Sequence, residues 1–467
     1  MSSTSKVGVC SNINKHPEYD NMVLSWQKMN DCQSEKYVKS RDDESNIDKV
    51  YLPKTSGQKA DATNGESDYQ TKKTRANFPS NLIDTERAMA GLLSKSKLVI
   101  EVPTPLDTIT ESITDNGEDI KALNARINDQ QLITSRCGLL VDLPVGGGEP
   151  YVVIYTAERI LNWDTIIADN DEKPTMVILD VSSYAIDKST GKWEWVKRCK
   201  VLGIDEIGYY TYETEDTLED IDFTKAPEDA ARPVISNSSA NEIPFVICNA
   251  SNTLFSVEDP CLEPLADDSL HYYRNSADYE ELLYMQTIAI LVRTGFSEED
   301  AKLTISVNEG ISSTNPDAKV YFAEVSGAGI SESRTALENT MLEMTNKGVA
   351  LMEAGANESG EALSIRLTTK TTKLTTIAAT SAQAIEKTLK IIARWMGIKD
   401  NEISISSSDD FTDNTLTVEE LEKLSAMVER GLFTQEDFHK KLNENGHTEE
   451  TFEEWKQKTE QTANMDM

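Results

Sequence analysis

Apolar residues recur three or four positions apart in the first third of the chain, which is the spacing of one helix face. Met22, Trp26 and Met29 follow this spacing within residues 18–41 and predict an amphipathic helix that faces a core. Further helices are predicted from Ser80 onward, where a Ser or Asn can cap the first turn, and over 116–135. The residues from 42 to 69 are rich in Lys, Asp, Ser, Gly and Asn and predict a long surface loop.

The middle of the chain is rich in β-branched and aromatic residues, with turn residues between short runs. This pattern predicts β-strands. Short buried strands are predicted within 98–103, 136–144 and 242–250, and an antiparallel meander or set of hairpins over 151–207. The acidic stretch 213–230 between them predicts a loop.

Beyond residue 267 the pattern becomes helical, and it is interrupted once by a short β-rich segment. A helix is predicted over 268–294, two strands near 303–308 and 318–325, and a second helix over 331–354 that ends at Gly355. Such an insertion of two helices and two strands buries little by itself. We therefore expect a protruding hairpin that neighbouring subunits stabilise, with the apolar stripe of Leu337, Met341 and Met344 at the subunit interface.

The end of the chain is predicted to be helical as well. A Thr-rich segment, 367–376, precedes a helix of about 375–396, and two acidic helices are expected over 417–430 and 434–445. With the β-rich middle, these elements predict an α+β protein. Its 467 residues suggest two or three domains.

Charge is strongly acidic and unevenly distributed. Asp and Glu number 80 against 46 Lys and Arg, which gives a formal net charge of −34. Residues 201–300 hold 22 acids and 4 bases. A surface of this sign repels a phosphate backbone, so tight nucleic-acid binding is not expected.

The sequence offers little for catalysis, metal binding or membrane insertion. Its six Cys form no CxxC motif, its four His form no ligand pattern, and the Gly146–Gly148 run is followed by Glu149-Pro150 rather than by the Lys of a phosphate-binding loop. No window is apolar enough to span a membrane, and the first residues lack a signal-peptide core. We expect a protein of the cytoplasm without enzymatic activity, metal or cofactor. The basic residues Lys72, Lys73 and Arg75 favour a subunit contact or a solvent-facing surface.

Several segments, in their order and spacing, resemble the portal (head-to-tail connector) proteins of tailed bacteriophages, in particular a portal-like group first catalogued without a known function. The segments that carry the resemblance are YQTKKTRANFPSNLIDTERAMAGLLSKS (69–96), RCGLLVDLP (136–144), YTAERILNWD (155–164), LHYYRNSADYEELL (270–283) and EKTLKIIARWMG (386–397). The 41–70 loop is shorter and looser than the resemblance leads us to expect.

The resemblance implies a portal-like fold whose parts map onto the chain in order. A mixed α/β wing occupies 1–267, two stem helices 268–294 and 331–354 flank a small β clip at 295–330, a tunnel-facing loop spans 355–376, and a helical crown covers 377–467. The insertion predicted from periodicity has the arrangement of a stem and clip.

The resemblance implies a ring of about twelve subunits at one capsid vertex, through which double-stranded DNA is packaged and ejected. Twelve copies would carry a formal charge of −408, and an acidic channel lets DNA slide without binding it. The expected partners are other copies of the chain, the major capsid protein and scaffold, the packaging motor (terminase large subunit), a tail adaptor and DNA in transit without sequence specificity. The expected location is the virion, at the portal vertex, with assembly in the host cytoplasm; no membrane is involved.

Candidate residues follow for each part of this function. The channel lining is assigned to Asp278, Glu281, Glu338 and Glu343, the tunnel loop to Arg366, Lys370 and Lys373, and partner docking at the clip to Ile305, Asn308, Tyr321, Phe322 and Glu324. The stem acids could instead face solvent or pair between subunits, and the loop bases could pair with acids of a neighbour. Another phage ring component, such as a head-tail adaptor or baseplate protein, is the alternative, and a hydrolase or transferase in the β-rich middle is a more distant one.

Overall fold

The computed structural model divides the chain into two compact units, Met1–Asp409 and Asp410–Met467, which are described separately. The residues described in the larger unit are 14–41, 50–144, 147–168, 171–215, 226–228, 230–235, 238–239, 241–287, 290–296, 315–323, 327–348 and 360–407. In the smaller unit they are 425, 427–428, 430, 434–444, 452 and 455–456. The chain is a mixture of helices and sheets, and the predicted α+β class is confirmed.

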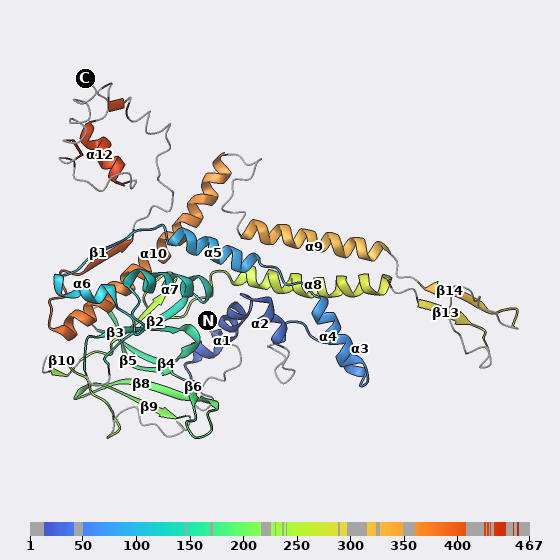
Figure 1. Cartoon of the computed structure of the whole chain (residues 1–467), viewed down its shortest axis with the longest axis horizontal. Coiled ribbons are helices and arrows are strands. Elements are labelled where there is room, and N and C mark those ends of the chain that lie inside the picture. Colours follow the sequence, from blue (N-terminus) through green and yellow to red (C-terminus); the bar gives the residue numbers. More distant parts are fainter. Residues whose placement is uncertain are drawn as a thin grey trace. The chain divides into compact units, whose positions relative to one another are not determined.

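Five helices open the larger unit (Figure 1). They are α1 (Pro17–Asp31), α2 (Glu35–Ser40), α3 (Ser56–Ala60), α4 (Gly65–Arg75) and α5 (Asn81–Leu93). The predicted helix over 18–41 is thus two helices, and Trp26 and Met29 are buried as expected. The predicted loop over 42–69 is wrong for its second half. There Tyr69 is buried and its hydroxyl donates to the carbonyl of Leu52 at 2.8 Å, so tertiary contacts hold a polar sequence in helical form.

A three-stranded antiparallel sheet and the helices around it form the main core. The sheet has the order β12–β2–β3, and α7 and α10 pack against it. Gly138 in β2 is needed for close packing, because a Cβ there would lie 2.2 Å from Cζ of Phe245. The elements are β1 (Leu98–Glu101), α6 (Thr104–Glu111), α7 (Ile120–Ile133), β2 (Arg136–Asp142), β3 (Tyr151–Thr156), β12 (Phe245–Asn249) and α10 (Gly360–Met396). The predicted strands within 98–103, 136–144 and 242–250 are confirmed.

A second antiparallel sheet follows β3, as the β-rich pattern of 151–207 predicts. Its strand order is β4–β5–β8–β9, which is a meander interrupted by the separate hairpin β6–β7. The elements are the 3₁₀ turn η2 (Ala157–Arg159), β4 (Ile160–Ala168), β5 (Asp171–Asp180), β6 (Ser183–Ile186), β7 (Trp193–Val196), β8 (Arg198–Asp205), β9 (Gly208–Glu215), β10 (Val234–Ile235) and β11 (Ser238–Ser239).

The helical hairpin and its β segment follow as α8 (Glu263–Thr287), β13 (Ile290–Thr294), β14 (Lys319–Ala323) and α9 (Gly327–Lys347). The order helix, strand, strand, helix is the predicted one, but the first strand lies earlier than expected. The predicted first helix, 268–294, instead ends at Thr287, and residues 290–294 form the strand β13. The predicted strand 303–308 lies outside the described residues.

Two predicted boundaries near the end of the larger unit are wrong. Residues 360–376, predicted as a tunnel-facing loop, are the first half of α10. Residues 377–409, predicted as crown, belong to the larger unit, because α10 packs on β2 and β12 and the strand β15 (Ser404–Ser407) pairs with β1.

The smaller unit contains α12 (Gln435–Glu444), within the predicted helix over 434–445. Thr434 caps it by accepting a hydrogen bond from the backbone N–H of Asp437 at 3.1 Å. Phe438, His439, Phe452 and Trp455 pack their rings together with centroids 5.4–6.2 Å apart. An aromatic cluster therefore forms the interior of the part of this unit that the structure describes.

Candidate functional site

The α8–α9 hairpin is the candidate functional element, because it joins a long helical pair to a small sheet. The two helices lie side by side and run in opposite directions (Figure 1). Lys347 at the end of α9 pairs with Asp268 near the start of α8 at 2.6 Å, which fixes this direction. At 1.5 Å per residue, the 25 residues of α8 span about 37 Å.

The base of the hairpin is anchored in a second hydrophobic cluster. Leu270, Tyr273 and Ala277 of α8 are buried there, together with apolar residues of α1, α2, α4 and α5. Gly348, directly after α9, lies against α5, and a Cβ at this position would be 2.5 Å from Oγ1 of Thr85. The packing of α8 at this end is therefore intramolecular on several sides.

The predicted subunit-interface residues on α9 mostly pack inside the chain. Met344 is fully buried, with its Sδ 3.7 Å from the hydroxyl of Ser269, and Leu337 is 7% exposed. Met341 is partly buried against the same cluster. Leu337 and Met344 are thus already buried in the single chain, Met344 against α8, and their assignment to a subunit interface stays a prediction.

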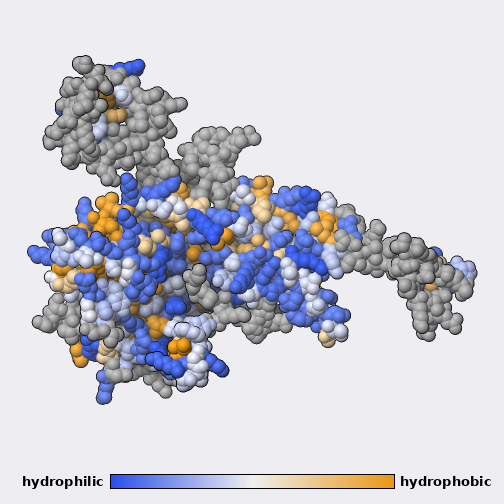
Figure 2. Space-filling model, in the orientation of Figure 1, coloured by the Kyte–Doolittle hydropathy of each residue, from blue (hydrophilic) through white to orange (hydrophobic). Residues whose placement is uncertain are grey.

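The opposite face of α9 is exposed among the residues that the structure describes. Leu342 is 61% exposed, although it is a large apolar residue. Figure 2 shows hydrophobic patches along α9 among hydrophilic side chains. The residues exposed on this outer face include Glu332, Arg334, Glu338, Leu342, Glu343 and Lys347. This outer face of α9 is one part of the helical pair that is open to a partner or to a channel; Tyr284 and Met285 of α8 are each 45% exposed as well.

The acids of α8 have structural partners. Lys72 of α4 is 6% exposed, and its Nζ lies 2.6 Å from Asp278 and 2.8 Å from Glu281. Burial lowers the pKa of Lys72, but hydrogen bonds to these two carboxylates outweigh it and raise the pKa above its ordinary value. Asp278 and Glu281 thus hold α4 on α8. Their assignment to the channel lining stays a prediction.

Other charged residues of this region also connect elements. Lys28 of α1 pairs with Glu263 and Asp267 of α8 at 2.9 and 2.6 Å. The guanidinium of Arg75 lies 3.5 Å from the ring centroid of Tyr284 on α8. Lys72 and Arg75, predicted as a solvent face or subunit contact, therefore attach α4 to α8. The sequence gives no signal for these pairs, whose members are more than 200 positions apart.

The acids of α9 remain on its outer face. Glu338 pairs with Arg334 of the same helix at 2.8 Å, and both side chains are more than 60% exposed. Such exposed pairs contribute little to stability. Glu343 is exposed as well. Of the four predicted channel acids, Glu338 and Glu343 are thus both exposed on α9, whereas Asp278 and Glu281 meet at Lys72.

The β segment at the turn of the hairpin is a two-stranded antiparallel sheet, β13–β14, with Val292 opposite Tyr321. Tyr321 is 52% exposed and Val320 is 39% exposed. The backbone of Phe322 lies in β14, while its side chain is outside the described residues. Ile305, Asn308 and Glu324 also lie outside them. A sheet of two strands has only edge strands, so this tip offers unpaired backbone groups to a partner.

The predicted tunnel-loop bases lie in or near the first half of α10. Arg366 and Lys370 belong to this helix by their backbone, and nothing further is described of them. Lys373 is exposed on the same helix. The structure thus places these residues on a helix rather than on a loop.

The residues that the structure describes contain no group of three or more His, Cys, Asp or Glu that could hold a metal ion. Among the same residues, no helix combines the length and apolar character needed to cross a bilayer.

One family model matches residues 261–396, described as a domain of unknown function (DUF4055). This span contains α8, the tip, α9 and α10 up to its last residue, and it is less than half of the chain. No curated protein matches the sequence.

Among solved structures, the chain is similar to components of gene transfer agent (GTA) particles at 11% identity. One is described as the virion of the native GTA particle, with a TM-score of 0.35 over 75% of this chain and 84% of that chain. Another is the neck of the empty GTA particle computed with C6 symmetry, with a TM-score of 0.37 over 74% and 84%. A third is the neck of the native GTA particle computed with C12 symmetry, with a TM-score of 0.35 over 80% and 92%.

Proposed function

We propose that this chain is a ring-forming structural component of a phage-type particle and, more specifically, its portal protein. The observation that carries the proposal is the α8–α9 hairpin with the β13–β14 sheet at its turn and the outer face of α9 uncovered. The segments that resemble portal proteins include residues 270–283 of α8 and 386–397 at the end of α10. In this role the chain has no catalytic activity and no cofactor.

A ring explains the outer face of α9. The helix α9, of 21 residues and about 31 Å, packs on α8 and contacts α5 near its end, where Asn81 donates to Thr345. An isolated chain leaves Leu342 in water, whereas neighbouring copies arranged about an axis bring successive hairpins side by side. Twelve such hairpins would form the wall of a channel, with the tip sheets at one end.

Charge favours DNA passage along this wall. The outer face of α9 carries Glu332, Glu338 and Glu343. Repeated around a ring, these carboxylates repel phosphates and release DNA as it advances, whereas a basic wall would retain it. The acids of α8 serve another purpose in this proposal: bound to Lys28, Lys72 and Lys347, they hold the hairpin on the body. The channel assignment therefore rests on Glu338 and Glu343.

The tip is the proposed docking site for the packaging motor and later for the tail adaptor. Tyr321 and Val320 are exposed side chains on an edge strand. Edge strands accept a further strand from a partner through backbone hydrogen bonds. The particle would hold the ring at one vertex, in contact with capsid protein and scaffold, and assembly would take place in the host cytoplasm.

The test combines an image with a charge reversal. Electron microscopy of the purified chain should show closed rings with a central hole and a projecting stem. A ring without a stem would favour an adaptor or baseplate component, and a compact monomer at high concentration would refute both. Glu338→Lys with Glu343→Lys should assemble but package DNA more slowly, most of all at low salt, because phosphate contacts become attractive.

A matched control carries the same change of charge elsewhere. Asp107 and Glu111 are both exposed acids and lie one helical turn apart on α6. Asp107→Lys with Glu111→Lys should package at the normal rate. Equal rates for both double variants would show that the acids of α9 do not line the DNA path.

A further inference from the structure

The hairpin β6–β7 presents an aromatic face to the outside of the larger unit. Tyr184 pairs with Trp195, and Ile186 pairs with Trp193, so these four side chains point to the same side of the two strands. Trp193 is 66% exposed, Tyr184 54% and Ile186 45%. Trp193 is the most exposed aromatic residue named among the described large hydrophobic side chains. A contiguous apolar patch of this kind marks an interaction site.

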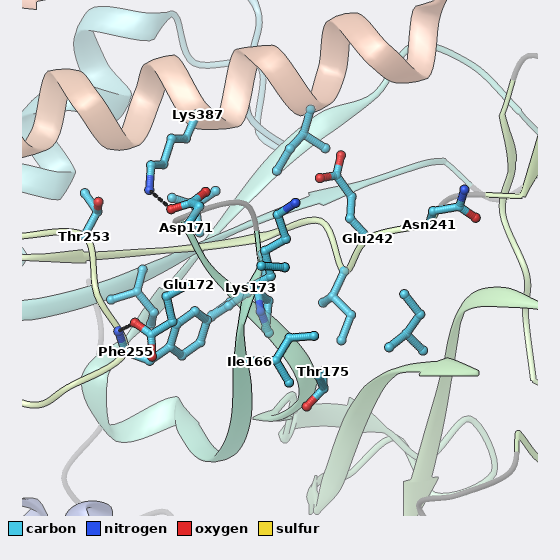
Figure 3. A pocket seen from close by; sticks show the side chains of 18 of the residues that line it. Ile166, Asp171, Glu172, Lys173, Thr175, Asn241, Glu242, Thr253, Phe255 and Lys387 are labelled. Carbon is cyan, nitrogen blue, oxygen red and sulfur yellow. Dashed lines mark hydrogen bonds and ion pairs between the residues drawn. The ribbon is translucent and has the colours of Figure 1, made fainter. Parts of the chain in front are cut away.

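A pocket with an apolar floor lies at the start of β5, the strand that leads into the β6–β7 hairpin. Its volume is about 520 Å³, and it opens between the β4–β5 turn, β12 and α10. Ile166, Ile204, Phe245, Phe255 and Ile391 supply the apolar lining. Figure 3 shows the pocket with Lys387 reaching from α10 to Asp171. Its volume lies within the range of pockets that bind small molecules, so the pocket can hold a large side chain.

The charges at the rim of the pocket pair with one another. Lys387 contacts Asp171 at 3.2 Å, Arg394 contacts Glu242 at 2.6 Å, and Lys390 contacts Glu386 at 2.5 Å. An anionic ligand would have to displace these carboxylates. An uncharged apolar group can instead enter beneath a polar rim that excludes water, which is the arrangement around interface hot spots. The expected occupant is therefore an exposed apolar side chain.

The same chain cannot place its own aromatic face in this pocket. Asp171, at the start of β5, lines the pocket, and β6 begins three residues after Asp180, the end of β5. Ten residues of a strand separate the two features by about 30 Å. An aromatic knob, formed by the side chains of this face on the hairpin beyond the end of β5, and a pocket at the start of β5 fit a head-to-tail contact between copies. Such contacts form a ring when the rotation between copies closes.

We propose that Trp193 and its neighbours on the β6–β7 hairpin insert into the pocket at Asp171, Phe245 and Ile391 of an adjacent copy of this chain. The inference rests on the proposed ring and specifies a contact within it. Each copy then contributes one knob and one pocket, so the contact repeats around the ring without leaving an unpaired end.

Photo-crosslinking of the full-length chain tests the contact in its assembled state. The photo-reactive amino acid p-benzoylphenylalanine is placed at Trp193, and a mixture of ¹⁴N- and ¹⁵N-labelled chains is assembled and irradiated. Covalent dimers of mixed isotope content should join this position to peptides from β5, β12 or α10. The control carries the same probe at Glu194, the next residue, which points to the opposite face of the hairpin. The inference would be overturned by cross-links to another surface or by cross-links within the same chain only. It would also be overturned by a yield of cross-links no higher than that from the probe at Glu194.

A mixing experiment tests the same contact by affinity. Trp193→Ser removes the knob, and Ile166→Arg blocks the pocket at a side chain that is already 53% exposed, so both variants should fold. Each alone should associate about 30-fold more weakly per contact. An equal mixture should recover one-to-one pairs of the two variants, because one variant keeps the pocket and the other the knob, but no closed rings, because the next contact would join the lost knob to the blocked pocket. No recovery, or unchanged association of Trp193→Ser, contradicts the contact. Wild-type rings that lack the Trp193 cross-link refute this inference alone, whereas a wild-type chain that stays monomeric refutes the proposed ring as well.

Discussion

Met344 and Leu342 lie two positions apart on α9 and should respond to truncation in opposite ways. Met344 is fully buried against α8, whereas Leu342 is 61% exposed on the outer face. Met344→Ala removes packing inside the chain and leaves a cavity beside Ser269. Leu342→Ala removes only a contact that another copy could supply.

The expected magnitude for Met344→Ala follows from its burial. Truncating a buried Met to Ala costs about 2–5 kcal/mol. We expect the lower half of that range, about 2–3 kcal/mol, because the outer face of α9 is exposed. Since each 1.4 kcal/mol is a factor of ten, protection of the α8 and α9 amides against hydrogen exchange should fall about 30- to 150-fold.

Hydrogen exchange followed by mass spectrometry on the dilute, dissociated chain measures this directly. Leu342→Ala should leave amide protection in the dissociated chain within about threefold of wild type, since exposed substitutions change stability by about 0.5 kcal/mol or less. It should weaken ring assembly in the concentrated sample. If Met344→Ala leaves protection of the dissociated chain unchanged and weakens only the ring, then Met344 lies between subunits, and the intramolecular packing of the hairpin is incorrect.

Three further outcomes are expected. Lys72→Met should lower the free energy of unfolding in urea by about 1 kcal/mol at low salt. The loss should be smaller at 1 M salt, because salt screens the pairs of Lys72 with Asp278 and Glu281 in the wild-type chain. The control Lys59→Met, at an exposed position of α3, should have no effect at either salt concentration. Burial, together with the nearby charge of Asp129, raises the pKa of Glu86 to about 7, so the folded chain binds this proton more tightly than the unfolded chain and stability falls as pH rises from about 4.5 to 7. Glu86→Gln should therefore raise the melting temperature relative to wild type at pH 8 and not at pH 4, and an equal shift at both pH values would contradict the assignment. Tyr321→Ala with Phe322→Ala should reduce motor binding in a pull-down while rings still form, and intact motor binding would exclude the tip as the docking site.

Local patterns in the sequence determined most secondary structure of the larger unit. The apolar run in RCGLLVDLP predicted β2, and the alternating, turn-bounded runs of 151–207 predicted the strands of the meander. The order of helix, two strands and helix after residue 267 was also predicted. These features depend on neighbours within about ten positions, so periodicity and turn residues are sufficient to predict them.

Segments without a clear pattern were mispredicted where distant contacts stabilise them. Residues 65–69 become part of α4 because Tyr69 is buried against Leu52, and the Thr-rich 367–376 continues α10. The strand β15 was missed because its partner β1 lies about 300 positions earlier. Short polar segments have weak local preferences, and tertiary packing decides their conformation.

The sequence by itself determined which residues of α9 are apolar and which are acidic, but only the tertiary structure decided what each face meets. Periodicity places Leu337 and Met344 on one stripe without naming the surface that covers it, and that surface proved to be α8 of the same chain. Likewise, the acids of α8 were visible in the sequence, while Lys72, which binds two of them, comes from a helix more than 200 positions away. A side chain's partner depends on the path of the whole backbone in space, and that path is absent from any local pattern.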